Sequence, residues 1–182
     1  MQKLSIHNGQ FVQGAGRFVP FGAVYFARKP GTCGGDYFAA EWWPDPLRHM
    51  DRDFARMREI GLNWVVPFVK TNPFYRKGKP VEKVWQRHDK MVELAGKHGL
   101  YLMPFPNHDW VRRFDDLMGR PYKDDPAHPH RHPSTDPQTY EATYKVNVDF
   151  ARRYRSENAV PLIMIRGGGR LWTGYCGYGP GE

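Results

Sequence analysis

Apolar and polar positions along the chain form blocks that repeat. Continuous apolar runs at 18–26, 62–69, 100–105 and 161–165 are typical of strands buried on both faces. Between these runs, apolar residues recur every three or four positions, which is the helical period. The pattern predicts strands at 21–26, 63–69, 101–105 and 161–165, and helices at 46–60, 83–98 and 137–155.

The predicted helices carry start and stop signals. Asp45 is suited to cap the first helix and Pro46 to its first turn, while Gly61 is suited to end it in a left-handed conformation. Asp136 and Pro137 begin the third helix in the same way. The residues expected to face inward are Leu47, Met50, Phe54 and Met57 in the first helix, Val84, His88, Met91 and Ala95 in the second, and Tyr140, Tyr144, Phe150 or Ala151, and Tyr154 in the third.

The connections between these elements indicate the fold class. Asn8-Gly9 between apolar segments at 4–6 and 10–12 predicts a β-hairpin. Turns after helices are short, at Gly61 and Gly99, and loops after strands are long, which is typical of parallel β/α units with a working face at the strand carboxyl ends. We therefore expect an α/β protein, an incomplete (β/α)8 barrel with about four parallel strands after an N-terminal hairpin. A doubly wound open sheet is the alternative, but the glycines at 31, 34 and 35 lie too far from a helix to form its phosphate-binding turn.

The chain divides into two parts at residue 165. Residues 1–165 read as the N-terminal half of a barrel, whose closed form needs about 250 residues. Residues 166–182 contain seven glycines and show no apolar period. We expect this tail to be the product of a truncation or a shifted reading frame, with a natural glycine-rich loop as the alternative. The open barrel edges predict self-association.

Composition narrows the classes of partner. The 27 Lys and Arg against 19 Asp and Glu give a formal net charge of +8, but the basic residues are dispersed, so a solvated surface is expected and no nucleic-acid partner. The two cysteines, Cys33 and Cys176, lie in no paired motif. No apolar stretch approaches the roughly 18 residues of a membrane span, and no signal peptide is readable. We expect no membrane partner and a cytoplasmic location for the chain as written, with secretion of a longer parent left open.

A candidate ligand site follows the first and third predicted strands. Asn107, His108 and Trp110 come directly after the third strand, and Tyr37 and Trp42 lie in the loop after the first. Because the carboxyl ends of parallel strands meet at one edge, we expect these five side chains to line one cleft. Polar groups that bond hydroxyls beside aromatic rings suit a sugar.

Other interpretations of these loops stay open. Trp42 and Trp43 could instead pack under the first helix, and the loop after the third strand could only cap the barrel. The alternating histidines at 128, 130 and 132 resemble a metal loop, but no acidic ligand is fixed nearby, so a polar surface loop is expected. We expect no metal and no cofactor.

The stretch from Phe18 to Val160 resembles the N-terminal half of clan A glycoside hydrolases, in particular the cellulase-like family 5. The resemblance rests on the opening hairpin before the segment 21–26, on the segment 51–66 and on the segment 88–102, in that order. It implies a (β/α)8 barrel and a retaining glycoside hydrolase that acts on O-glycosidic bonds of a β-linked polysaccharide or oligosaccharide.

The chain departs from the family where the chemistry should be. Val66 and Pro67 stand where these enzymes often carry an Arg, and Ile165 is followed by Arg166 and three glycines instead of an Asn-Glu pair, which occurs nowhere in the chain. The nucleophile of the family belongs to a seventh strand. Retaining hydrolysis needs two carboxyls about 5 Å apart. We therefore assign no catalytic residue and expect an inactive fragment; a non-catalytic carbohydrate-binding or degenerate barrel protein, or another barrel hydrolase, are the alternatives.

Overall fold

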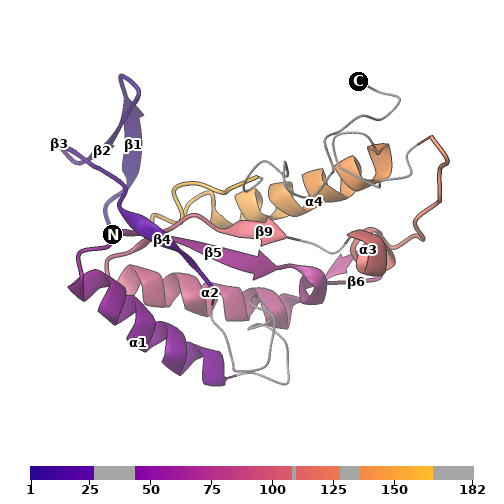
Figure 1. The fold of residues 1–182 in the computed structure, drawn as a ribbon, viewed down its shortest axis with the longest axis horizontal. Helices are drawn as coiled ribbons and strands as arrows, with labels where there is room; N and C mark the ends of the chain where they lie inside the picture. Colours follow the sequence, from indigo (N-terminus) through magenta and orange to yellow (C-terminus); the bar gives the residue numbers. More distant parts are fainter. Residues whose placement is uncertain (27–43, 108–109, 128–135, 166–182) are drawn as a thin grey trace.

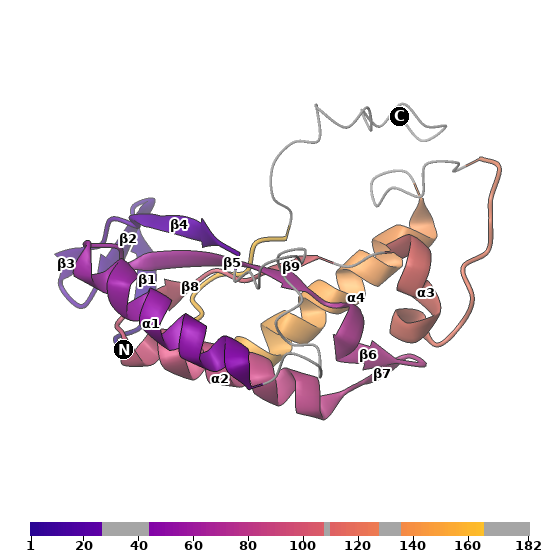
Figure 2. The same cartoon turned by 60° about the horizontal axis from the view of Figure 1, so that its bottom comes forward.

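The structure is a computed structural model that describes residues 1–26, 44–107, 110–127 and 136–165. Its centre is a parallel sheet with helices packed on one face (Figure 1). Helices α1 and α2 lie side by side along this face, as Figure 2 shows from a second direction. The main helices are α1 (Asp45–Glu59), α2 (Glu82–Lys97) and α4 (Pro137–Tyr154).

The sheet confirms the predicted parallel arrangement. Strand β4 (Gly22–Tyr25) pairs in parallel with β5 (Trp64–Lys70), with Gly22 opposite Trp64. On its other side β5 pairs in parallel with β8 (Tyr101–Leu102) and β9 (Phe105–Asn107). Pro104 lies between β8 and β9 and has no N–H for the ladder, so the predicted third strand forms as two short pieces.

The predicted fourth strand, 161–165, is wrong as a strand, although the segment lies beside the third. The Leu102 N–H donates to the Ala159 carbonyl at 2.7 Å, and the Met164 N–H donates to the Pro104 carbonyl at 2.9 Å. Pro104 and Pro161 lie in the two segments that these bonds join, and neither has an N–H to donate. One proline in each segment therefore stops a regular ladder that the apolar sequence alone predicts.

The observed helix limits agree with the predicted limits to within one residue. Helices α1 and α2 each end two residues before a glycine. Gly61 and Gly99 have φ of +91° and +70°, the left-handed conformation expected after a helix. Pro46 lies in the first turn of α1, but Pro44 and not Asp45 is the capping residue, and no side chain bonds the helix start. Asp136 does cap α4, where its carboxylate accepts from the Gln138 and Thr139 backbone N–H groups.

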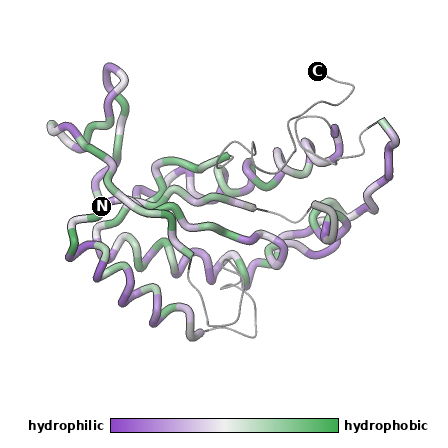
Figure 3. Tube along the Cα trace, viewed as in Figure 1, coloured by the Kyte–Doolittle hydropathy of each residue, from purple (hydrophilic) through white to green (hydrophobic). Residues whose placement is uncertain are grey.

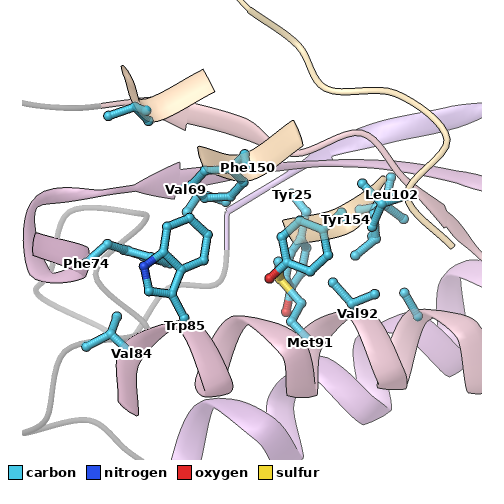
Figure 4. Close-up of a cluster of buried hydrophobic side chains, with 14 of the residues drawn as sticks. Tyr25, Val69, Phe74, Val84, Trp85, Met91, Val92, Leu102, Phe150 and Tyr154 are labelled. Atoms are coloured by element: carbon cyan, nitrogen blue, oxygen red, sulfur yellow. The ribbon is translucent and has the colours of Figure 1, made fainter. Parts of the chain in front are cut away.

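The main core lies between the helices and the outer face of the sheet, by which we mean the face that carries Val65 and Val69. Both valines are fully buried in one cluster with Phe54 of α1, Met91 of α2 and Phe150 of α4. Figure 4 shows Val69, Met91 and Phe150 of this cluster. Figure 3 shows hydrophobic residues running along β4 and β5. The inward stripes of α1 and α2 are therefore confirmed at their central positions.

The inward stripe expected for α4 is wrong in its first half. Tyr140 and Tyr144 are 60% and 61% exposed, and their rings stack on the outer surface. The buried positions are Thr139, Ala142, Val146, Phe150 and Tyr154, which keep the helical period. The buried face of α4 begins with a threonine and an alanine, which are less hydrophobic than the two tyrosines. A prediction based on hydrophobicity therefore chooses the tyrosines.

The first strand of the sheet is not buried on both faces as expected. Tyr25 is buried under α1, where its ring packs on Phe54 and its hydroxyl donates to Asp53 at 3.0 Å. Val24 is 57% and Phe26 is 48% exposed, because no described helix or strand covers the side of β4 that faces away from α1.

The N-terminal hairpin is confirmed and closes the amino end of the sheet. Strand β1 (Leu4–His7) pairs with β2 (Gln10–Gln13), and Asn8 and Gly9 both have positive φ, as a two-residue hairpin turn requires. A third short strand, β3 (Gly16–Arg17), extends it. A second small cluster follows there: Leu4, Trp64 and Tyr101 with partly buried Phe18, Val66, Met103 and Leu162.

Candidate functional site

The carboxyl ends of β4, β5 and β9 meet at one edge of the sheet. The arrowheads of β5 and β9 point to the side where α3 and β6 lie (Figure 1). Lys70 is the last residue of β5 and stands opposite Asn107, the last residue of β9. This edge is where a barrel of this kind binds ligands, so it is the candidate site.

An aromatic row crosses the sheet just below this edge. The rings of Phe26 and Phe68 stack with centroids 5.2 Å apart, and Phe68 meets Phe105 edge to face at 5.3 Å. The register places Phe68 beside Phe105 on neighbouring strands. The row gives the edge an apolar floor that continues onto the exposed face of β4.

Two excursions rise from the strand ends and form the rim of the site. The 3-10 helix η2 (Asn72–Phe74) and the hairpin β6 (Tyr75–Arg76) and β7 (Lys79–Pro80) follow β5, and α3 (Trp110–Met118) follows β9. The sequence analysis predicted no helix between 98 and 137 and therefore missed α3. Its signal was present, since Val111, Phe114 and Met118 recur at three- and four-residue spacing.

The two excursions are fastened to each other. The Gly78 N–H donates to the Asp116 carbonyl at 2.8 Å, and a Cβ at Gly78 would meet the Gly119 Cα at 3.0 Å. The buried carboxylate of Asp116 accepts from the guanidinium groups of Arg76 and Arg113, each at 3.0 Å. This part of the rim is therefore held in one arrangement.

A second contact ties the rim to α4. The Tyr75 hydroxyl donates to the Asp149 carboxylate at 3.1 Å, and the Lys145 ammonium lies 3.0 Å from the same oxygen. Burial, with the nearby negative charge of Asp149, raises the pKa of Tyr75 above its ordinary range. Tyr75 is therefore a neutral donor that fixes structure and not a proton carrier.

Of the predicted site residues, only two have a described position. Asn107 ends β9 at the candidate edge, and Trp110 begins α3, three residues farther along the chain. Tyr37, Trp42 and His108 lie outside the described residues, so a common cleft for the five stays a prediction. Trp43, the histidines at 128, 130 and 132, and the tail 166–182 also lie outside the described residues.

Several of the described carboxylates have partners within the fold. No strand of the parallel sheet, within the described ranges, ends in Asp or Glu; the last residues are Tyr25, Lys70, Leu102 and Asn107. Asp51 contacts Lys97 and His98, and Asp116 and Asp149 belong to the rim contacts above.

The strongest electrostatic network lies between α2 and α4. Arg153 donates to the Asp89 carboxylate at 2.6 and 2.9 Å and to Glu82 at 2.7 Å, while its guanidinium stands over the Trp85 ring. The Tyr154 hydroxyl donates to Asp89 at 2.8 Å. Despite the opposing effect of burial, these bonds hold the pKa of Asp89 below its usual value.

His88 completes this network in the core. Its Nδ1 lies 2.6 Å from the Tyr154 oxygen, and its side chain is fully buried. Burial lowers the pKa of His88 to about 3, so the ring is neutral at physiological pH. Because the tyrosine hydroxyl already donates to a carboxylate, Nδ1–H is the donor to the tyrosine oxygen. The network binds two helices and does not reach the candidate edge.

Metal-binding clusters and membrane-spanning helices are both absent from the described residues. No group of three His, Cys, Asp or Glu side chains gathers there in a way that could hold a metal ion. No described helix combines the length and apolar character needed to cross a membrane.

Comparison with known proteins identifies the architecture. No family model and no curated protein sequence matches this chain. The solved exo-beta-1,4-mannosidase Op5Man5 from Opitutaceae bacterium strain TAV5 matches with a TM-score of 0.60 and 24% identity, over 87% of this chain and 27% of its own. A GH5_18 structure from Bifidobacterium longum subsp. infantis matches with a TM-score of 0.50 and 18% identity, over 70% of this chain and 30% of its own.

These likenesses establish the fold. The chain spans less than a third of the length of either solved structure. It folds as part of a (β/α)8 barrel of the kind that glycoside hydrolases of this group have, which confirms the predicted fold class.

Proposed function

We propose that this chain is part of a clan A glycoside hydrolase barrel of the cellulase-like family 5, and that it binds a β-linked oligosaccharide without hydrolysing it. The observation that carries the proposal is the match of 87% of the chain to a solved exo-beta-1,4-mannosidase. In barrels of this kind ligands bind at the carboxyl ends of the strands, and here that edge carries Lys70 and Asn107.

The class of sugar follows from the same match and from the sequence. The solved relative is named for β-1,4-linked mannose, so short β-1,4-mannosides are the first ligands to consider for this chain. Asn107 and His108 supply hydrogen-bonding groups for hydroxyls, and Tyr37, Trp42 and Trp110 supply rings on which a sugar can lie. These five residues are the proposed binding set.

The absence of turnover is proposed from the carboxylates. A retaining mechanism needs one carboxyl as acid and another as nucleophile, about 5 Å apart. No described strand of the parallel sheet ends in such a residue, and the sequence has no Asn-Glu pair after 165 or anywhere else. The same observation favours the second candidate, a non-catalytic carbohydrate-binding or degenerate barrel protein. An Asn-Glu pair in the downstream reading frame would decide for the hydrolase fragment.

Calorimetric titration tests the binding proposal. We expect β-1,4-mannotriose to bind and the α-linked maltotriose to give no saturable heat. Trp110→Ala should weaken mannotriose binding about tenfold, which corresponds to about 1.4 kcal/mol, and His108→Ala should also weaken it. His49→Ala, at an exposed position on α1, is the matched control and should bind as the unmodified chain does. Equal affinity for both sugars, or no effect of Trp110→Ala, would contradict the proposed site.

A further inference from the structure

Within the described ranges, Lys70 is the one charged residue that ends a strand of the parallel sheet. Val65 and Val69 of the same strand lie in the main core. Because side chains alternate along a strand, Phe68 and Lys70 lie on the opposite face of the sheet. We call this the inner face, since in a (β/α)8 barrel it faces the barrel axis while the helices cover the other face. Lys70 therefore stands at the top of the inner face, at the candidate edge.

The surroundings of Lys70 combine apolar and polar groups. Phe68 lies two residues earlier, in the aromatic row that it forms with Phe26 and Phe105. The strand register sets Lys70 opposite Asn107, so an amide residue follows the row on the next strand. Lys70 is half-buried. A cation that is partly removed from water attracts an anion more strongly than a cation on the open surface does.

The rim of the site carries most of the formal charge of the chain. Residues 70–80 and 110–123 contain eight Lys or Arg against two Asp, which is +6 of the total of +8. Asp124 and Asp125 follow in the segment that leads from α3 toward α4 (Figure 1). Cations that are dispersed in the sequence thus come together when the two excursions are fastened to each other. A site bordered by charge of one sign concentrates ligands of the opposite sign.

The hairpin after β5 presents its cations at a fixed tip. Arg76 stands opposite Lys79 in the β6–β7 pair, and the side chains of both are exposed, as is Lys77 in the turn between them. Lys77 has a φ of +50°, a left-handed conformation in which Asn, Asp and Gly are the ordinary residues. The close contact of Gly78 with Gly119 holds this turn. A lysine is therefore kept at a position that its own backbone preference disfavours, which is a mark of functional sites.

We infer that the ligand of the candidate edge is an acidic β-linked oligosaccharide, and that Lys70 binds the carboxylate of one of its uronic acid units. This inference rests on the proposed sugar-binding function and names the class of sugar. The aromatic row offers a surface for the apolar face of a sugar ring, and Lys70 lies next to that row. The cations of the rim attract the charged ligand toward the edge through their field.

Calorimetric titration with matched trisaccharides tests the inference on the full chain. β-1,4-Trimannuronate differs from β-1,4-mannotriose only in carrying carboxylates at C6. At about 50 mM salt it should bind at least about tenfold more tightly than mannotriose, and this advantage should shrink at about 500 mM salt, because exposed charges are screened. The α-1,4-linked trigalacturonate carries the same charge as trimannuronate in a different geometry, and it should give no saturable heat.

Three substitutions locate the charge that matters. Lys70→Met keeps the apolar stem, so it should remove most of the advantage of trimannuronate and leave mannotriose binding unchanged. Lys77→Asn removes a cation but suits the left-handed position, so it should fold and weaken trimannuronate binding about threefold at the lower salt alone. Lys90→Met is the matched control on α2, where the lysine is 54% exposed on the helical side, and it should change neither affinity.

The outcomes separate this inference from the proposed function. Trimannuronate binding no more tightly than mannotriose would overturn the inference and leave the proposed function intact. Trigalacturonate binding as tightly as trimannuronate, or an effect of Lys90→Met as large as that of Lys70→Met, would also overturn it, because net charge alone would then explain the attraction. Binding of no trisaccharide would overturn the proposed function and the inference together. Circular dichroism shows whether Lys70→Met is folded, and the comparison of the three ligands on the unmodified chain decides the matter without that variant.

Discussion

His88 should make the stability of the fold fall as the pH is lowered below neutrality. The ring is fully buried beside Tyr154, and its pKa in the folded chain is about 3 against an ordinary value of 6.5. The unfolded chain therefore binds a proton at His88 in a range where the folded chain does not. Stability from this group is complete above pH 6.5 and is lost as the pH falls from there toward 3.

The size of the effect follows from the width of this window. Each pH unit inside it changes the free energy of unfolding by about 1.4 kcal/mol. Between pH about 7.5 and pH about 4.5 the loss from His88 is about 2.7 kcal/mol. The carboxylates with lowered pKa, Asp51 and Asp89, lose their contribution only at more acidic pH, below their ordinary value of 3.8. Between these two pH values the effect of His88 is therefore separated from that of Asp51 and Asp89.

Urea denaturation at a series of pH values measures this effect. His88→Gln should remove about 2.7 kcal/mol of the pH dependence relative to the unmodified chain, whatever its stability at neutral pH. His49→Gln removes an exposed histidine and should leave the pH dependence unchanged. If His88→Gln and the unmodified chain show the same slope between these pH values, then His88 is not held neutral in the core and the reasoning is refuted.

Two further substitutions test how the elements are held together. Arg153→Ala removes the bridge from α4 to two carboxylates of α2 and should lower the free energy of unfolding by about 2 kcal/mol, while the exposed neighbour Arg152→Ala should change it little; equal effects in chemical denaturation would refute the bridge. Gly22→Ala would place a Cβ 1.8 Å from the Trp64 carbonyl oxygen, whereas the Cβ of Gly16→Ala would make only an ordinary contact at 3.7 Å. Thermal melts should show that Gly22→Ala lowers the free energy of unfolding by more than about 3 kcal/mol and that Gly16→Ala does not. Equal stability of the two variants would contradict the close pairing of β4 with β5.

The parallel β/α order could be predicted from the sequence because its signals are local. Asn8-Gly9 specifies the hairpin, and Gly61 and Gly99 end helices in the left-handed conformation. The apolar runs at 63–69 and 101–105 identify strands without any knowledge of their neighbours. Each of these features depends on a few adjacent residues, so a single sequence is sufficient.

Features that depend on distant partners could not be predicted in the same way. The apolar run 161–165 forms no regular ladder because it contains Pro161 and lies beside the segment that contains Pro104. That pairing can be seen only in the folded chain. Tyr140 and Tyr144 were expected on the buried face of α4, but Thr139 and Ala142 lie on that face instead. Hydrophobicity alone cannot choose between two faces of a helix when the buried residues are small.

In the candidate site, too, local features could be predicted and contacts between distant segments could not. The order of the strands was enough to place Asn107 at a strand end, and the structure puts it opposite Lys70. The rim was not predicted, because the Gly78 and Gly119 contact and the shared carboxylate of Asp116 join segments about forty residues apart.

The central proposal, that this chain keeps part of a (β/α)8 barrel and binds a sugar without hydrolysing it, is tested most directly by release of nitrophenolate from p-nitrophenyl β-mannoside. The assay is run on the repurified chain beside mannotriose titration of the same sample. The account predicts saturable binding of mannotriose and no release above buffer. Release that survives repurification and is abolished by Asp109→Asn or Glu41→Gln would contradict it, because it would show that one of these carboxylates acts as the acid.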